Sequence, residues 1–285
     1  MANLKEIRNR ISSVSSTMQI TSAMKMVSAA KLKKAQDAIV AMRPYADKLS
    51  FLLAGLGQNL EEGTDNVYAE KRATKKVLLV AISSNRGLCG AFNTNVIKAV
   101  KAASESYGKE VLVETLTIGK KAADGLKGAN RAGDHSSIFD DLTFDASAIV
   151  ANELIDAFIA EQYDEIRLIY NSFKNAATQT VKNEPFLPML AEEDASETTE
   201  EYIFEPSAEE IVNELIPKAL KIQLYKAIRD SFASEHGARM TAMHKATDNA
   251  KELRDQLKLT YNKARQAAIT NEILEIVGGA EALNG

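Results

Sequence analysis

Apolar side chains recur at alternating intervals of three and four residues along the start of the chain. The run is strict from Leu4 to Met18 and continues less regularly to Met42. This spacing places the apolar positions on one face of a helix, and good helix formers fill the segment. We therefore predict a helix from about residue 3 to the mid-fifties, roughly 80 Å long, with Pro44 as a candidate kink. The apolar positions are Leu4, Ile7, Ile11, Val14, Met18, Met24, Val27, Ala35, Ile39 and Met42.

A second long helical pattern occupies the end of the chain. Residues 207–210 have the form of a capping box, and only Pro217 and Gly237 interrupt the pattern that follows. The predicted helix is roughly 100 Å long. Its apolar positions are Ile211, Leu215, Leu220, Leu224, Ile228, Met240, Met243, Ala250, Leu253, Leu257, Tyr261, Ala264 and Ile273.

Two helices of this length bury their apolar stripes most simply along each other, as an antiparallel coiled coil. The C-terminal helix is the longer one, so we expect it to extend beyond its partner by a dozen or more residues, roughly 20–30 Å. That end still carries apolar side chains that need a cover. They are Ile269, Ile273, Leu274, Ile276 and Val277.

The middle of the chain alternates between strand and helix patterns. This order favours a small, mostly parallel sheet with helices on its faces, a Rossmann-like α/β domain inserted between the long helices. The predicted elements are strands at 75–84, 110–119 and 165–173, helices at 93–108 and 145–163, the second capped by Asp145, and a proline-containing edge strand at 181–190. We divide the chain into an N-terminal coiled-coil helix (1–58), an α/β domain (74–190), an acidic loop (191–206) and a C-terminal coiled-coil helix (207–285).

Composition and charge support this division. The chain is 45% hydrophobic and 26% charged, typical of a globular protein, and no apolar stretch reaches membrane-spanning length. Residues 1–50 hold nine Lys and Arg against three Asp and Glu, 218–285 hold eleven against eight, and 51–217 hold fifteen against twenty-eight. The basic ends and the acidic middle therefore indicate two separate objects. The N-terminal residues have neither a signal-peptide nor a transit-peptide pattern, so we expect the chain to stay in the compartment that makes it.

Few residues suggest chemistry. A single cysteine, Cys89, excludes an internal disulfide and a cysteine-based metal cluster, and the three histidines are scattered, so we predict no metal site. The segment SSNRGLCGAFN (83–93) follows a strand and opens a helix, where backbone amides can hold a phosphate. It lacks a nucleotide-binding motif, and we favour a tight turn with a packed thiol. The lysines near 31–34 have no aromatic neighbours, which favours a protein-facing stripe over nucleic-acid binding.

The two ends resemble one family. ITSAMKMVSAAKLKKAQ (20–36) resembles the N-terminal helix of the γ subunit of F-type ATP synthases, and ITNEILEIVGGAEA (269–282) resembles that family's C-terminal signature. SSNRGLCGAFN, YIFEP (202–206) and ASEHGARMTAMHKATDNA (233–250) also match in order. The resemblance covers nearly the whole chain. The redox segment of plastid relatives is not seen, which with the missing transit peptide indicates a bacterial type.

The resemblance implies a rotor shaft, not itself an enzyme, that couples proton-driven rotation of a membrane c-ring to conformational changes of the catalytic subunits. Its partners would be the α and β subunits, ε and the c-ring, with no nucleic acid. It would sit on the cytoplasmic face of the bacterial membrane, peripherally, through the complex alone. The protein ring would cover the apolar end of the C-terminal helix.

The resemblance also implies contact residues. Those facing the catalytic ring are Met24, Lys25, Arg265, Gln266, Thr270, Glu272 and Glu275, and those at the foot, near c and ε, are Tyr202 and Glu205. For Met24 the alternative is a coiled-coil core position, and for the C-terminal group it is an exposed helix face stabilised by its own ion pairs.

Two other functions remain open on the sequence. The chain could be a non-enzymatic coiled-coil tether or nucleic-acid-binding protein, which would bind DNA with a steep salt dependence. It could also be a nucleotide-using enzyme, which would bind ATP tightly in isolation.

Overall fold

The structure, a computed structural model, describes residues 4–59, 67–70, 72–108, 110–189 and 208–284. It forms two compact units. The α/β unit comprises Ala29–Arg239, and the coiled-coil unit comprises Met1–Ser28 with Met240–Gly285. Two long helices, α1 (Leu4–Asn59) and α5 (Ala208–Asn284), each contribute to both units. The predicted long terminal helices are therefore confirmed, and Pro44 and Pro217 both lie inside them.

The α/β unit contains a five-stranded sheet in the order β3-β2-β1-β4-β5. The first four strands in the chain are parallel, and β5 pairs antiparallel with β4 at the edge. The predicted mostly parallel sheet is confirmed, as is the edge position of the strand that contains Pro185. The strands are β1 (Lys76–Ile82), β2 (Leu112–Ile118), β3 (Arg131–Asp134), β4 (Glu165–Phe173) and β5 (Gln179–Leu187).

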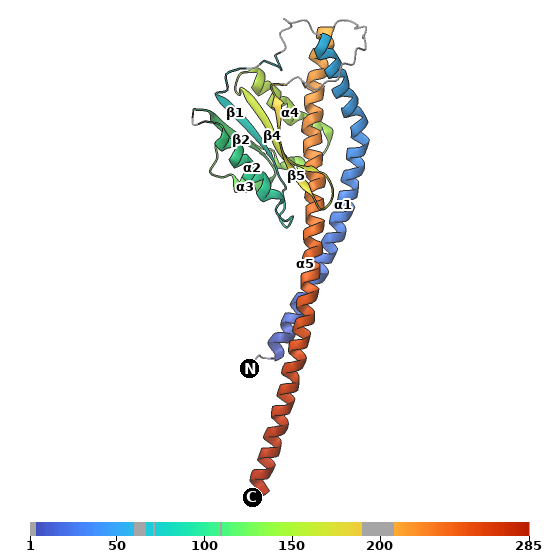
Figure 1. The fold of residues 1–285 in the computed structure, drawn as a ribbon, viewed down its shortest axis with the longest axis vertical. Helices are drawn as coiled ribbons and strands as arrows, with labels where there is room; N and C mark the ends of the chain where they lie inside the picture. Colours follow the sequence, from blue (N-terminus) through green and yellow to red (C-terminus); the bar gives the residue numbers. More distant parts are fainter. Residues whose placement is uncertain (1–3, 60–66, 71, 109, 190–207, 285) are drawn as a thin grey trace. The chain divides into compact units, whose positions relative to one another are not determined.

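Helices cover both faces of this sheet (Figure 1). Alternate residues of β1 explain the layers: Leu78, Val80 and Ile82 pack toward α4 and α5, whereas Val77 and Leu79 pack toward α2 and α3. Residues on both sides of the strand are therefore buried, which is why KVLLVAI is an unbroken apolar run. The helices are α2 (Phe92–Ser106), α3 (Lys120–Gly125) and α4 (Phe144–Ile159), with a short 3-10 helix η1 (Ser136–Phe139).

Two details of the α/β unit differ from the sequence prediction. The cap of α4 is Thr143, whose side-chain oxygen accepts a hydrogen bond from the Ala146 amide at 3.2 Å, and Asp145 lies in the first turn instead. The prediction of Asp145 was wrong because both residue types are good caps and the backbone decides between them. The elements α3, β3 and η1 were not predicted, since each has six residues or fewer and shows no clear period.

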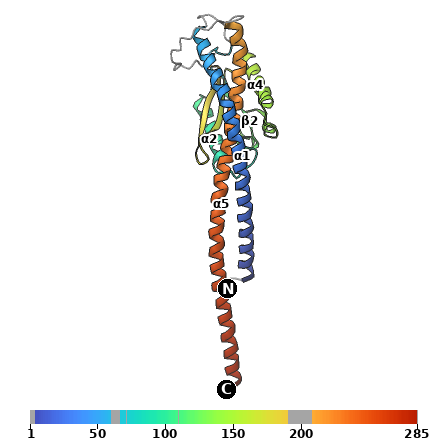
Figure 2. The ribbon, with the colours of Figure 1, turned by 90° about the vertical axis from the view of Figure 1, so that its right-hand side faces the viewer.

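The coiled-coil unit is antiparallel (Figure 2). Arg8 donates to the Tyr261 hydroxyl at 2.8 Å, and Thr247 donates to the Thr21 hydroxyl at 2.8 Å. Residue numbers therefore increase along α1 while those of the contacting residues decrease along α5. Some of the α1 positions that face α5 are polar, and Thr21 and Ser28 are both buried there. The Ser28 hydroxyl donates a hydrogen bond to the Met24 carbonyl at 2.8 Å.

Among the described residues, three apolar positions assigned to the stripes are exposed: Ile273 in the overhanging end of α5, and Val27 and Leu253 within the seam. Val27 is 57% exposed, and the buried neighbour is Ser28 at 3%. Leu253 is 47% exposed, whereas Arg254 faces the partner helix and reaches the Met18 sulfur at 3.7 Å. At both places the residue that faces the seam is the polar one that follows the apolar residue. The register of one helix against the other decides which side chains enter the seam, whether they are apolar or polar.

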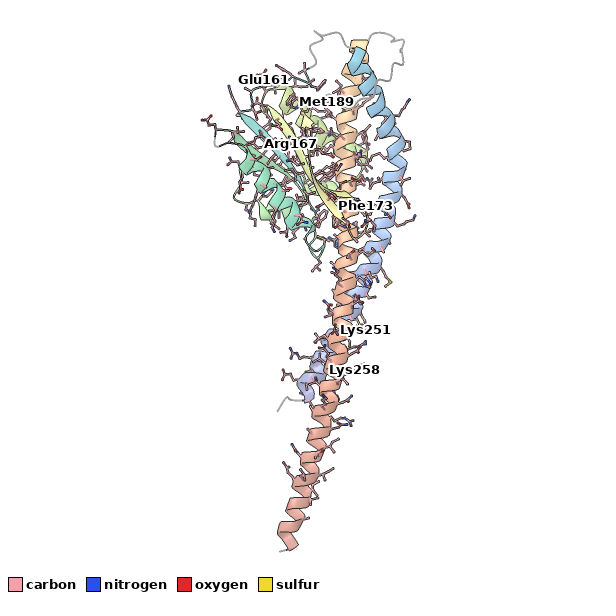
Figure 3. The ribbon with its side chains drawn as sticks, in the orientation of Figure 1. Glu161, Arg167, Phe173, Met189, Lys251 and Lys258 are labelled. Atoms are coloured by element: carbon pink, nitrogen blue, oxygen red, sulfur yellow. The ribbon has the colours of Figure 1, made fainter. Side chains whose placement is uncertain are left out.

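The end of α5 extends beyond α1 in the coiled-coil unit (Figure 2). Every residue from Arg265 to Ala280 is exposed, and the helix continues to Asn284, about 30 Å in all. Lys251 and Lys258, which precede this end on α5 and are labelled in Figure 3, are exposed as well. The predicted overhang is confirmed.

Within the described residues, no helix combines the length and apolarity needed to cross a membrane.

Candidate functional site

The carboxyl ends of β1 and β4 are the first place to look for a ligand site. Strand order reverses between these two neighbours, because β2 lies on the other side of β1. In open α/β sheets such a point forms the crevice that binds nucleotides. The β1–α2 turn, residues 83–91, borders it, so the contacts of this turn decide whether a phosphate fits.

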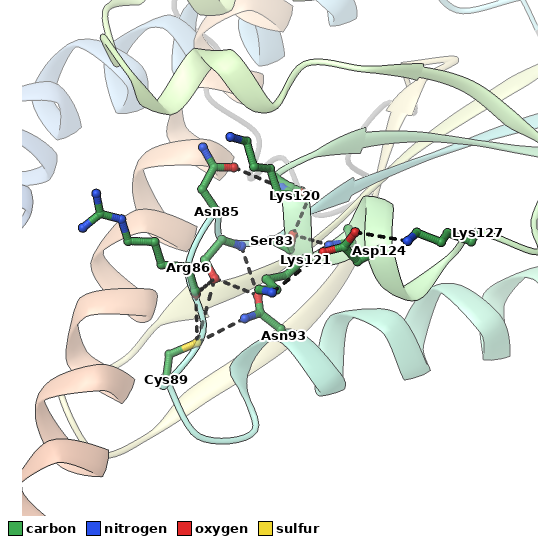
Figure 4. A network of polar contacts seen from close by, with 12 residues as sticks. Ser83, Asn85, Arg86, Cys89, Asn93, Lys120, Lys121, Asp124 and Lys127 are labelled. Atoms are coloured by element: carbon green, nitrogen blue, oxygen red, sulfur yellow. Dashed lines mark hydrogen bonds and ion pairs between the residues drawn. The ribbon is translucent and has the colours of Figure 1, made fainter.

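The polar groups of the β1–α2 turn bond to one another (Figure 4). The Ser84 amide donates to Asn93 Oδ1 at 3.0 Å, the acceptor position that a phosphate oxygen would take. The Ser84 hydroxyl donates to the Arg86 carbonyl at 2.6 Å, and Asn93 Nδ2 donates to the Cys89 sulfur at 3.2 Å. The turn is therefore closed by its own side chains, in agreement with the tight turn predicted for this segment.

A second turn, between β2 and α3, packs against the first (Figure 4). The Lys120 amide donates to Asn85 Oδ1 at 3.0 Å, and the Ala122 amide donates to the Ser83 hydroxyl at 2.8 Å. Gly119, at φ +117°, allows this approach, because a Cβ there would lie 2.5 Å from the Ser83 carbonyl oxygen. The amides at the start of α3 are thus also used internally.

Helix α5 occupies the crevice itself. Ser231 donates to the Ile82 carbonyl at the end of β1 at 3.5 Å, and Ser172 near the end of β4 donates to Asp230 at 3.0 Å. Gly237 lies against the β4–β5 turn, where an added Cβ would be 3.2 Å from Ala176 Cα. Phe173, at the carboxyl end of β4, is labelled in Figure 3 beside α5. The chain's own helix therefore fills the position that a nucleotide takes in related sheets.

Cys89 is a buried thiol, 1% exposed. Burial is the main cause that raises its pKa, and the nearby Arg239 guanidinium opposes this only in part. The thiolate is the reactive form of cysteine, so this environment disfavours a nucleophile. The packed thiol predicted for this turn is what the structure contains.

A cluster of charged and polar groups lies buried beneath the turn. Arg239 pairs with Glu235 at 2.7 Å, with side-chain exposures of 8% and 9%. Burial raises the pKa of Glu235 despite its Arg239 partner. Sequence reasoning missed this cluster, although its i,i+4 Glu–Arg spacing inside ASEHGAR was a visible signal.

His236 belongs to the same cluster. Its pKa is lowered to about 3, first by burial and then by the positive charges of Arg239 and Lys31. The ring is therefore neutral, and its Nδ1, 3.3 Å from Arg239 Nη1, accepts a hydrogen bond there. Nε2 is buried and has no hydrogen-bond partner among the residues described.

The predicted ring-facing residues on α1 lie at the polar part of the seam. Met24 and Lys25 are both half-buried. Lys25 Nζ is 3.4 Å from His244 Nδ1 on α5, and His244 Nδ1 is 3.4 Å from Asp248. Lys25 thus falls in the seam, and Met24 is neither a fully buried core residue nor a fully exposed one.

The predicted ring-facing residues on α5 are all exposed. The Thr270 hydroxyl donates to the Gln266 carbonyl at 3.0 Å. Arg265 makes no ion pair with any residue that the structure describes. The other members of this set are Glu272 and Glu275. Tyr202 and Glu205, the foot residues, lie outside the described part of the chain.

Across the described ranges, no group of three or more His, Cys, Asp and Glu side chains is placed to hold a metal ion.

Comparison with known proteins decides the family. The model of the ATP synthase family matches residues 3–283. The ATP synthase gamma chains of Flavobacterium johnsoniae and Christiangramia forsetii are 67% and 62% identical to this chain, and each comparison covers 100% of both chains. The chain belongs to the ATP synthase gamma chain family. The gamma chain of Flavobacterium psychrophilum, 68% identical over both full lengths, is another relative from this family.

Solved structures show the same fold. A chain of the central stalk and c-ring of Tetrahymena thermophila mitochondrial ATP synthase matches with a TM-score of 0.58 and 29% identity, covering 80% of this chain and 99% of that one. A chain of the Euglena gracilis mitochondrial ATP synthase rotor matches with a TM-score of 0.65, at 22% identity, covering 93% and 98%. The predicted combination of long terminal helices and a central α/β sheet is therefore confirmed.

Proposed function

We propose that this chain is the central shaft of a bacterial F-type ATP synthase, coupling proton-driven rotation of the c-ring to ATP synthesis or hydrolysis. The observation that carries the proposal is the lone end of α5, exposed at every residue from Arg265 to Ala280 although it includes Ile273 and Ile276. Such apolar side chains need a protein cover, and a ring of catalytic subunits supplies one. The names of the full-length relatives support this reading.

The physical role follows from asymmetry. Identical catalytic sites differ in affinity only if something touches each of them differently, and a single antiparallel helix pair inside a ring does so. Turning the shaft then passes each site through every state. The α and β subunits perform the chemistry, while ε and the c-ring hold the foot, so this chain supplies no catalytic group, metal or cofactor. It is expected at the cytoplasmic face of the membrane through the complex alone.

The contacts within this assembly are part of the proposal. Tyr202 and Glu205 are assigned to the foot by resemblance, and the division of the chain at 58, 74, 190 and 207 follows the predicted elements.

Reconstitution tests the function: the purified chain, added to the other subunits, is expected to restore ATP-driven proton pumping. Tight ATP binding by the chain alone, without restoration, would favour the enzyme alternative instead.

Met24→Lys is expected to lower proton pumping more than ATP hydrolysis. The change adds an ammonium beside Lys25, at a half-buried position. By resemblance, this position passes close to an acidic loop of the catalytic subunit, which would attract the added charge and hold the shaft at one angle. The measurement is protons pumped per ATP hydrolysed in reconstituted vesicles. Met26→Lys is the control, because Met26 is 65% exposed on the same helix. Equal losses of pumping and hydrolysis would instead indicate a coiled-coil core role for Met24.

Replacing Arg265 and Gln266 together by alanine is expected to leave the fold intact and reduce ATP synthesis. Both side chains are exposed, so the free energy of unfolding should change by less than about 0.5 kcal/mol. Arg265 would lose its donors to a carboxylate of the ring. Assembly and synthesis are measured separately, with Asn262→Ala/Lys263→Ala as an exposed control pair. Normal synthesis in the Arg265/Gln266 variant would remove these residues from the ring contact.

A further inference from the structure

The buried Glu235–Arg239 pair on α5 is more than a local ion pair. Withdrawing two charges from water costs several kcal/mol per ion, so such a pair is weak evidence for stability by itself. Its other contacts therefore need an explanation. Arg239 Nη2 lies 3.1 Å from the Arg86 carbonyl oxygen and 3.2 Å from that of Gly87, and Nε lies 3.4 Å from the latter.

The guanidinium divides its donors between two elements. Nη1 bonds to Glu235 and to His236 on its own helix, while Nε and Nη2 bond to consecutive carbonyls of the β1–α2 turn. The planar fork of arginine makes both sets of bonds at once, which a single ammonium cannot do. Glu235 orients the fork from the α5 side.

The turn that receives these bonds has an unusual backbone. Leu88 has φ +62° and its side chain is 66% exposed, although leucine rarely adopts this region. No burial of the leucine side chain compensates for this conformation. The carbonyls immediately before Leu88 are those that Arg239 holds, so the pair on α5 fixes the turn at its least favourable point.

We propose that Arg239, oriented by Glu235, is a positioning residue that fastens α5 to the β1–α2 turn, so that the sheet and this part of the shaft turn together. The inference rests on the rotor function proposed above. Three further contacts also hold α5 to the sheet. Each joins a residue in the segment 230–237 of α5 to a residue at or just beyond the end of β1 or β4. They are Asp230 with Ser172, Ser231 with Ile82, and Gly237 with Ala176.

Cys89 provides the test. It is the chain's single cysteine, it is buried within the turn, and a thiol reagent reaches it only when the turn opens. In the purified full chain, Arg239→Ala is expected to speed labelling of Cys89 by about tenfold or more, because charged hydrogen bonds to the turn are lost. Arg239→Lys and Glu235→Gln, which perturb the fold less, should give smaller increases.

Arg229→Ala is the matched control. Arg229 lies on the same helix and donates to a backbone carbonyl of the α/β unit, that of Leu142 at 2.7 Å, but not to the turn. It should leave the labelling rate near that of the unmodified chain. If the Arg239 variants label no faster than Arg229→Ala, the fastening is disproved and the rotor function is untouched.

A second readout connects the fastening to rotation. In the reconstituted complex, Arg239→Lys is expected to lower protons pumped per ATP hydrolysed, whereas Arg229→Ala is not. Faster labelling with normal pumping would overturn the role in rotation. Failure of the unmodified chain to restore pumping would overturn the proposed function itself, whatever the labelling rates.

Discussion

Gly119→Ala is expected to lower the free energy of unfolding by about 3–5 kcal/mol, because backbone strain and several displaced hydrogen bonds add together. Gly119 has φ +117°, a region that side chains with a Cβ rarely adopt. The new Cβ would lie 2.5 Å from the Ser83 carbonyl oxygen and 2.7 Å from the Ser83 carbonyl carbon. Both are backbone atoms and cannot rotate away.

The displacement would spread through both turns. The Ser83 hydroxyl accepts a hydrogen bond from the Ala122 amide and donates one to the Gly119 carbonyl at 3.1 Å. Moving the backbone of Ser83 or of Gly119 therefore disturbs both hydrogen bonds. Unfolding of the full chain in urea measures the effect. Because the turn also encloses Cys89, the same variant should label faster at that thiol.

Two other glycines grade the effect. Gly90→Ala meets no atom within 4 Å but has φ +60°, so strain alone is expected to cost about 1–2 kcal/mol. Gly128→Ala meets no atom within 4 Å and has no positive φ, and it should change stability by less than about 0.5 kcal/mol. Equal losses at Gly119 and Gly128 would refute the close approach of the two turns.

His236 is expected to make the protein less stable as the pH falls below 6.5. Burial and the charges of Arg239 and Lys31 lower its folded-state pKa from 6.5 to about 3, so the folded protein keeps the ring neutral. The unfolded chain takes up a proton at about pH 6.5 and gains stability relative to the folded state. The contribution is therefore fully present above pH 6.5 and is lost as the pH falls toward 3.

The size of this effect follows from linkage. Each pH unit below 6.5 removes about 1.4 kcal/mol, so about 2 kcal/mol is lost by pH 5. The measurement is the free energy of unfolding from pH 7.5 to 5. His236→Gln should flatten the profile, because glutamine does not titrate. Glu235, whose raised pKa acts in the opposite direction, is retained in both proteins and does not affect the difference.

His244→Gln is the control for a histidine on the same helix. His244 is exposed in the coiled-coil unit, so this variant should keep the acid loss that His236 causes. An unchanged pH profile in His236→Gln would show that the buried ring is not the source of the loss.

The sequence by itself determined the large elements. The spacing of three and four from Leu4 to Met18, continued less regularly to Met42, was sufficient to predict α1, because an apolar stripe with helical spacing indicates a helix wherever its partner lies. The apolar run KVLLVAI predicted β1 in the same way, and the two prolines near Leu187 placed β5 at the edge. The signature residues at both ends were sufficient to indicate the family.

Tertiary structure decided the contacts that close the site. Arg86 and Arg239 are more than a hundred residues apart in the chain. No local sequence pattern shows that the Arg239 guanidinium on α5 binds the backbone carbonyls of the β1–α2 turn. The same holds for the seam, where Ser28 is buried and Val27 exposed because the register of α1 against α5 selects positions by geometry. Local propensity determines which segments are helices and strands, whereas only packing determines which polar groups meet. The occupation of the β1–β4 crevice by α5 is therefore visible in the structure alone.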